Sequence, residues 1–124
     1  MPEECRDFLK ACLADGHGEK YDLAVAVIMP DHLHMLIRPK EKGAGYYSLQ
    51  EITKPLKGVS ARKMNMMLGR IGSFWVGESF DRIIRNEEDW REKYSYIMNN
   101  PVKAGLAEKP NDYPWLIVNE NIRP

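Results

Sequence analysis

Two neighbouring runs of hydrophobic residues dominate the first third of the chain. Seven consecutive apolar residues occupy positions 23–29, and a second, mostly apolar run follows the turn-like pair Pro30-Asp31. Runs rich in β-branched residues and bounded by turn signals are typical of strands. The pattern therefore predicts two adjacent strands, Tyr21–Met29 and His32–Arg38, joined by a sharp reversal.

Helical periodicity surrounds this pair of strands. A first helix is predicted over Glu3–Ala14 and a second from Ser48 towards Leu68, where Ser48 caps the helix and Glu51 completes a capping box. Pro55 lies within the second helix and indicates a kink or a later start. The apolar side of the first helix is expected to hold Phe8, Ala11, Cys12 and Leu13.

The remainder of the chain predicts one more strand and one more helix. Residues 39–45 form a charged loop, and an extended segment covers residues 74–84. Asn86 caps a helix over residues 87–99, which must end before Pro101 because the residue preceding a proline disfavours the helical conformation. The proline-punctuated tail is then expected to pack three apolar side chains onto the domain: Tyr113, Trp115 and Leu116.

The order helix, strand, strand, helix, strand, helix indicates an α+β fold with helices on one face of an antiparallel sheet. A further strand at the front would complete the ferredoxin-like (RRM-like) βαββαβ arrangement, and that first strand is missing from this chain. The 124 residues, 44% apolar and 29% charged, fit one globular domain over residues 1–124 that is short at its N-terminus.

Targeting and redox signals favour a cytoplasmic protein. No apolar run approaches the roughly 20 residues that span a bilayer, and the acidic N-terminus lacks the layout of a secretory signal. Cys5 and Cys12 are two helical turns apart, roughly 10 Å, which is too far for a disulfide. We therefore expect reduced thiols and no membrane partner.

The net charge of zero conceals a basic middle section. Residues 53–85 carry seven basic side chains against two acidic ones. A polyanion partner explains such an excess, although a solvated helix face is the more frequent cause. Six of the seven are candidates for contact with nucleic acid: Lys54, Lys57, Arg62, Lys63, Arg82 and Arg85.

The clearest chemical signal is a pair of histidines at the start of the second strand. His32 and His34 are two residues apart, so alternation along a strand points both imidazoles to one face while Leu33 and Met35 turn towards the core. Imidazole is the commonest protein ligand for metal ions, and two on one strand supply much of a metal site. The alternative is that one histidine forms a hydrogen bond in the core and the other faces water.

A second candidate group lies in the last predicted helix. Tyr96 and Asn100 are four residues apart and share a helix face if the helix persists to Asn100. A tyrosine hydroxyl can attack phosphorus, and an amide oxygen beside two imidazoles suits Mg²⁺ or Mn²⁺ better than a closed zinc site. The alternative is that Tyr96 is a packing residue.

These motifs resemble those of the single-tyrosine HUH (His-hydrophobic-His) transposases, particularly the REP-associated type. The resemblance spans about residues 21–116 and keeps the family's order of blocks. The blocks that carry it are Met29–Ile37, Gly72–Trp75, Phe80–Asn86, Tyr96–Leu106 and Asp112–Trp115.

The resemblance implies a metal-dependent nuclease and strand transferase that acts on single-stranded DNA, typically an imperfect hairpin. It implies that His32 and His34 bind a Mg²⁺ or Mn²⁺ ion and that Asn100 completes the coordination. The nucleophile is the tyrosine that opens the Tyr-Ile-x-Asn-Asn-Pro block, Tyr96 rather than Tyr94. Attack by this tyrosine forms a 5′-phosphotyrosine link and releases a 3′-hydroxyl.

Two departures from the family keep other interpretations open. The chain begins at the first helix rather than at a strand, and its net charge is low for a DNA-binding enzyme. A catalytically inactive descendant that only binds hairpin DNA or RNA is the main alternative. A hydrolase that uses water, with Tyr96 orienting the substrate, is a third. A homodimer, with the sheet completed by a partner chain, also stays open.

Overall fold

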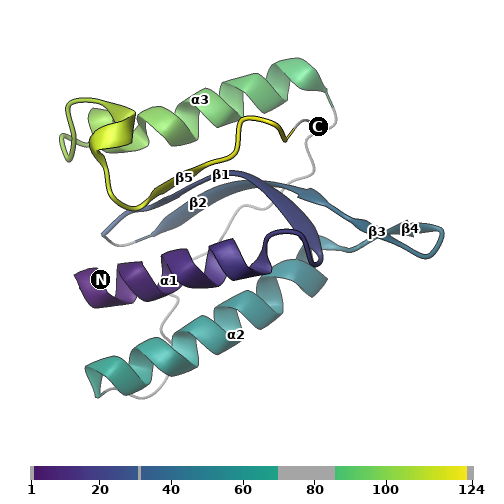
Figure 1. Cartoon of the computed structure of the whole chain (residues 1–124), viewed down its shortest axis with the longest axis horizontal. Helices are drawn as coiled ribbons and strands as arrows, with labels where there is room; N and C mark the ends of the chain where they lie inside the picture. The colour runs from purple at the N-terminus through teal and green to yellow at the C-terminus, as the bar shows by residue number, and fades with distance from the viewer. Residues whose placement is uncertain (1, 31, 70–85, 123–124) are drawn as a thin grey trace.

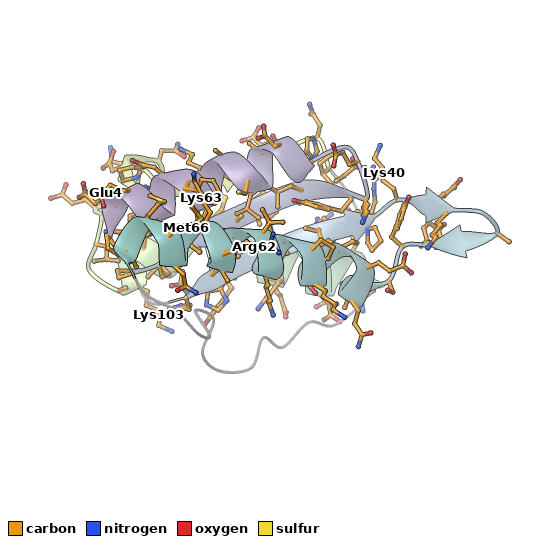
Figure 2. All side chains as sticks on the ribbon, turned by 90° about the horizontal axis from the view of Figure 1, so that it is seen from below. Glu4, Lys40, Arg62, Lys63, Met66 and Lys103 are labelled. Atoms are coloured by element: carbon orange, nitrogen blue, oxygen red, sulfur yellow. The ribbon has the colours of Figure 1, made fainter. Side chains whose placement is uncertain are left out.

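The computed structural model describes residues 2–30, 32–69 and 86–122. Within them, a three-stranded antiparallel sheet lies between one helix on one face and two helices, side by side, on the other (Figures 1 and 2). The elements in chain order are α1 Glu3–Gly16, β1 Tyr21–Ile28, β2 Leu33–Pro39, β3 Glu41–Lys42, β4 Gly45–Tyr46, α2 Leu49–Leu68, α3 Glu87–Lys103, the 3-10 helix η1 Pro110–Asp112 and β5 Leu116–Val118.

The α+β class and the antiparallel pairing of β1 with β2 are confirmed, but the prediction that all helices cover one face is wrong. α1 and α2 pack on one face of the sheet and α3 packs on the other. The physical reason lies in β1, whose residues 23–28 are all fully buried. A strand that is apolar on both faces is stable only when other elements pack on both. An uninterrupted apolar run such as residues 23–29 is typical of such a strand.

A β-bulge in β1 decides which residues face which layer. The register with β2 shifts between Leu23 and Val25. Before the shift, Leu23 faces α1 and α2, whereas after it Ala26 faces them and Val25 and Val27 face α3. One extra residue in a strand reverses the alternation beyond it in this way. Because Val27 pairs with His34, this register also places His34 on the α3 side.

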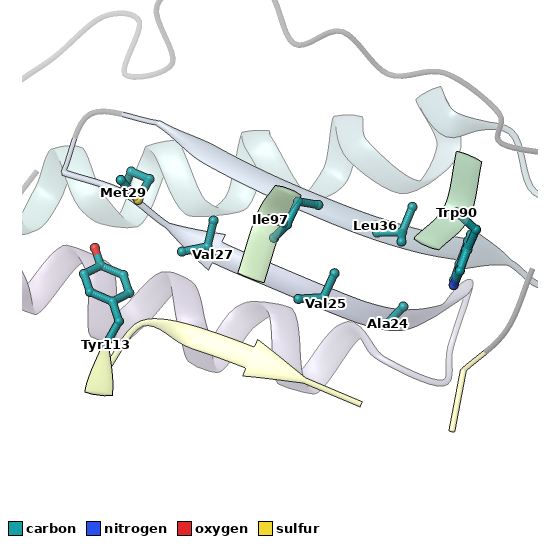
Figure 3. Close-up of a cluster of buried hydrophobic side chains, with 8 residues drawn as sticks. All are labelled: Ala24, Val25, Val27, Met29, Leu36, Trp90, Ile97 and Tyr113. Atoms are coloured by element: carbon teal, nitrogen blue, oxygen red, sulfur yellow. The ribbon is translucent and has the colours of Figure 1, made fainter. Parts of the chain in front are cut away.

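The core between α3 and the sheet holds the last helix in place. Trp90 and Ile97 of α3 pack against Val25, Val27 and other residues of β1 and β2 (Figure 3). Ile97 is fully buried and Trp90 is 4% exposed. These residues, seven positions apart, put one stripe of the helix against the sheet, and the adjoining stripe therefore lies at the edge of the interface.

The C-terminal tail packs as predicted and also adds a strand that the sequence did not reveal. Tyr113 is buried, and its hydroxyl donates a hydrogen bond of 2.6 Å to the carbonyl of Ile28. Trp115 and Leu116 pack against the α3-side core. β5, only three residues long, pairs antiparallel with β1. The strand predicted over residues 74–84 lies outside the described residues, so the ferredoxin-like arrangement stays a prediction.

Three local predictions need correction. α3 does not end before Pro101 but continues to Lys103. The buried proline lies near the end of the helix, where it removes only one backbone hydrogen bond. Gly105, with a φ of 76°, follows the helix end. Residues 39–45 are not simply a loop, since they include most of the short β3–β4 hairpin. The buried stripe of α1 is Cys5, Leu9 and Leu13, while Ala11 is exposed and Phe8 and Cys12 are half-buried.

The helix caps behave as the sequence indicates. The Glu51 N–H donates to the Ser48 hydroxyl at 3.1 Å, and the Asp89 N–H donates to the Asn86 side chain at 2.8 Å. α2 starts at Leu49 and includes Pro55 in its second turn, so the later start, near Thr53, does not occur. In the described part of the chain, none of the helices has the length and apolar character needed to cross a membrane.

Candidate functional site

The two histidines lie side by side where β2 begins, although His32 directly precedes the strand rather than opening it as predicted, and His34 lies within it. Their ring centroids are 4.7 Å apart, and the rings meet edge to face at 83°. A backbone hydrogen bond of 2.8 Å from the Met29 N–H to the His32 carbonyl closes the reversal between β1 and β2 and holds His32 next to the strand. The structure therefore brings the two imidazoles together, as alternation along the strand predicts.

Tyr96 of α3 lies against this pair within the same chain. Its ring centroid is 5.7 Å from that of His34, again edge to face at 83°. Tyr96 precedes the buried Ile97, so it lies one position around the helix from the stripe that packs on the sheet. The side chain is 48% exposed, which leaves the ring in contact with His34 and still open to solvent.

The structure separates Tyr96 from its neighbour Tyr94. Tyr94 is half-buried and packs against the core between α3 and the sheet. The interpretation of a final-helix tyrosine as a packing residue thus applies to Tyr94. Tyr96 alone of the two has its ring beside a histidine and exposed to solvent.

Asn100 meets the condition set for it, while its role stays a prediction. α3 persists to Lys103, so Asn100 lies one helical turn beyond Tyr96 on the same flank of the helix. Its backbone carbonyl accepts a 3.0 Å hydrogen bond from the Ala104 N–H, and the residue is half-buried. Its position on the helix puts Asn100 on the side of α3 that carries Tyr96.

A cation that the sequence analysis did not single out also reaches this site. The ammonium of Lys93 lies 5.0 Å from the centroid of the Tyr96 ring. Lys93, Tyr96 and Asn100 are spaced i, i+3 and i+7, so one flank of α3 carries all three. That spacing is visible in the sequence, but Lys93 lies outside the basic section of residues 53–85.

The electrostatic environment keeps His34 uncharged. Its pKa is lowered from 6.5 to about 4, mainly by burial and further by the neighbouring His32 and Lys93. A neutral imidazole retains a lone pair that can bind a cation at neutral pH. The described residues contain no cluster of three or more histidine, cysteine, aspartate or glutamate side chains that could hold a metal ion. Two adjacent imidazoles with an amide on the facing helix fit a divalent cation that keeps some of its water.

The six basic residues predicted to contact nucleic acid lie on α2 or outside the described residues. Arg62 and Lys63 are exposed on α2, on the face of the molecule formed by α1 and α2 (Figure 2). That face is opposite the one where α3 carries Tyr96. Contact of these two residues with nucleic acid stays a prediction. Lys54 and Lys57 also lie on α2, and Arg82 and Arg85 lie outside the described residues.

Comparison with known proteins identifies one family. The sequence pattern of IS200-like transposases matches residues 3–100, which is most of the chain. A Haemophilus influenzae protein that bears the name REP-associated tyrosine transposase is 26% identical over 109 residues. The REP-associated tyrosine transposase of Escherichia coli K12 is 24% identical over 103 residues.

A solved structure has the same fold. It is that of a REP-associated tyrosine transposase bound to a REP hairpin, and it aligns with a TM-score of 0.65 at 20% identity over 92% of this chain. The alignments cover 83% and 82% of this chain but only 62% and 57% of the two relatives, and 63% of the solved chain. This chain thus spans about three-fifths of the length of the proteins it matches.

Proposed function

The chain belongs to the IS200-like transposase family, and from that premise we propose that it cuts and rejoins single-stranded DNA through Tyr96. The observation that supports this most directly is the meeting of two elements from distant parts of the sequence. β2 supplies His34 and α3 supplies Tyr96, with ring centroids 5.7 Å apart. A nucleophile at the edge of a helix, next to neutral imidazole and open to solvent, is suited to a polymer that approaches from outside.

In the proposed reaction, the Tyr96 hydroxyl oxygen attacks phosphorus in the DNA backbone. A bond forms between that oxygen and phosphorus, and the bond from phosphorus to the preceding 3′-oxygen breaks. The tyrosine proton is lost to solvent, and the departing 3′-oxygen takes up a proton. The strand is left as a 5′-phosphotyrosine, and attack by another 3′-hydroxyl reverses the steps and completes the transfer.

The residues around Tyr96 have separate tasks in this proposal. A Mg²⁺ or Mn²⁺ ion bound by His32, His34 and Asn100 would polarise the phosphate and stabilise the charge that develops on it. Burial on the α3 side keeps His34 neutral and oriented. Ile97, packed in the core, holds the helix so that Tyr96 stays next to His34. His32, His34 and Tyr96 lie together within one chain, so this part of the site does not require a homodimer, which stays a prediction.

We further propose that the DNA is a single-stranded hairpin. The support is the family, together with the solved REP-associated tyrosine transposase of the same fold that is bound to a REP hairpin. The exposed Lys54 and the half-buried Lys57 of α2 remain candidates for backbone contact, as do Arg82 and Arg85. Contact of Arg62 and Lys63 with DNA would require the hairpin to reach the opposite face of the molecule.

The test is whether the protein forms a covalent adduct with DNA. The protein is incubated with Mg²⁺ or Mn²⁺ and a single-stranded oligonucleotide copied from the DNA that flanks its gene, and the products are separated under denaturing conditions. We expect an adduct with the intact protein, none with Tyr96→Phe, and an undiminished amount with the matched control Tyr94→Phe.

Two other outcomes would contradict the proposal in different ways. Cleaved DNA without an adduct, with some cutting retained in Tyr96→Phe, would indicate a hydrolase that uses water. A shift of the hairpin in a native gel with neither adduct nor cleavage under any metal would indicate the binding-only descendant.

A further inference from the structure

We infer that Lys93 holds the DNA phosphate beside Tyr96, so that the flank of α3 supplies both the nucleophile and the positive charge that receives the substrate. This inference rests on the proposed function, because it assigns a further residue to the same site. None of the six basic residues predicted from the sequence lies on α3.

The first support is position. Lys93 lies three residues before Tyr96, and its ammonium is 5.0 Å from the centre of the tyrosine ring. Trp90 and Ile97, both buried, fix the helix on either side of Lys93. A phosphate placed for attack by the Tyr96 hydroxyl must come within about 3–3.5 Å of that oxygen. A lysine side chain anchored one turn away can reach such a phosphate by rotating its flexible stem.

The second support is that the charge of Lys93 is directed towards the site. On α3, among the residues that the structure describes, the ion pair within hydrogen-bond distance joins Glu87 to Arg91, at 2.9 Å. The Lys93 ammonium instead lies 5.0 Å from the centre of the Tyr96 ring. Lysine binds phosphate as a compact point charge, so an ammonium beside the nucleophile is suited to an anionic substrate.

A purely structural role would give different results. If Lys93 only held the Tyr96 ring, its loss would disturb the ring but would not change how the protein senses backbone charge. If Lys93 binds the phosphate, its loss removes one ionic contact with DNA and also slows the chemical step. Loss of one phosphate contact lowers the slope of log affinity against log salt by about one. Loss of a group that stabilises charge in the transition state slows such reactions by about a hundredfold to a thousandfold.

The experiment compares Lys93→Gln, Lys93→Arg and the matched control Arg91→Gln, which removes one positive charge from the solvent-exposed side of the same helix. The rate of adduct formation is measured at saturating oligonucleotide, using the gene-flanking sequence with Mn²⁺. Affinity is measured over a range of salt concentrations in a Tyr96→Phe background, where no adduct can accumulate. Circular dichroism checks that each variant is folded.

We expect Lys93→Gln to slow adduct formation about a hundredfold to a thousandfold and to lower the salt slope by about one. Lys93→Arg should stay within a few-fold of the original rate, and Arg91→Gln should change neither quantity. An unchanged rate in Lys93→Gln, with adduct still formed, would overturn the inference and leave the proposed function intact. A rate for Lys93→Arg as low as that for Lys93→Gln would also overturn it.

If the intact protein forms no adduct, the proposed function fails and the salt slope alone decides the role of Lys93. A slope lowered by about one in Lys93→Gln would still support phosphate binding at this residue. An unchanged slope would overturn the inference as well.

Discussion

Replacing Ile97 by alanine tests whether the core beneath α3 is what positions Tyr96. Ile97 is fully buried and packs against β1 and β2, in the same core cluster as Trp90 (Figure 3). The substitution keeps helix propensity high, since alanine is the best helix former, so its effect comes from packing. It also changes no atom of Tyr96 or of the histidines.

The expected magnitude follows from the carbons removed. Ile97→Ala deletes three carbon atoms, each worth about 0.8 kcal/mol when buried, so the transfer contribution is about 2.4 kcal/mol. The incompletely filled cavity raises the total, and measured substitutions of this kind cost about 2–5 kcal/mol. We therefore expect the free energy of unfolding to fall by about 3–4 kcal/mol. For a chain of this length that corresponds to a fall in Tm of very roughly 10–15 °C.

The assay is urea unfolding followed by circular dichroism, with Met66→Ala as the control. Met66 lies on α2 and is 71% exposed, so its truncation should change the free energy of unfolding by no more than about 0.5 kcal/mol. At a temperature where both variants are folded, Ile97→Ala should also form the DNA adduct more slowly than Met66→Ala. A loss of less than about 1 kcal/mol for Ile97→Ala would refute the packing argument. An unchanged adduct rate would refute the link between packing and the position of Tyr96.

Two further predictions follow from the electrostatics of β1 and β2 and from the histidine pair. Asp22→Asn should cost at most about 1 kcal/mol at neutral pH, because its 2.8 Å ion pair with Arg38 is partly open to solvent. The hydrogen bond from Arg38 lowers the pKa of Asp22 below its usual 3.8, so this stabilisation is present above that value and is lost as the pH falls through the folded-state pKa. Urea unfolding at several pH values checks it, and a difference between variant and parent that persists at strongly acidic pH would contradict the assignment. His32→Ala should weaken Mn²⁺ binding, measured by isothermal titration calorimetry. It should also abolish the adduct while leaving hairpin binding largely intact. Mn²⁺ binding as tight as in the parent would contradict a role for His32 in the metal site.

The sequence by itself determined the elements whose signals are local. The apolar run at 23–29, the turn that follows it and the alternation of His32 and His34 depend only on neighbouring residues, because backbone geometry sets which side chains share a face. The caps at Ser48 and Asn86 were visible for the same reason, since a cap satisfies N–H groups within three residues of itself. The family motifs likewise follow the chain in order.

Only the tertiary structure decided how these elements face one another. The apolar run indicated burial on both faces of β1, yet a one-residue bulge between Leu23 and Val25 was needed to assign each side chain to its layer. Pro101 remains in α3, where packing in the core outweighs the loss of one hydrogen bond. β5 exists because β1 offers it an edge, since three residues carry too weak a signal of their own.

The candidate site was likewise only partly predictable from the sequence. The sequence identified His34 and Tyr96 but did not show that their rings meet, that Tyr94 packs in the core, or that Lys93 joins the site. It also did not show that α2, which carries Arg62, packs on the face of the sheet opposite α3. Charge and spacing along a chain are local properties, but the side of a sheet that a helix covers depends on which apolar faces must be buried together.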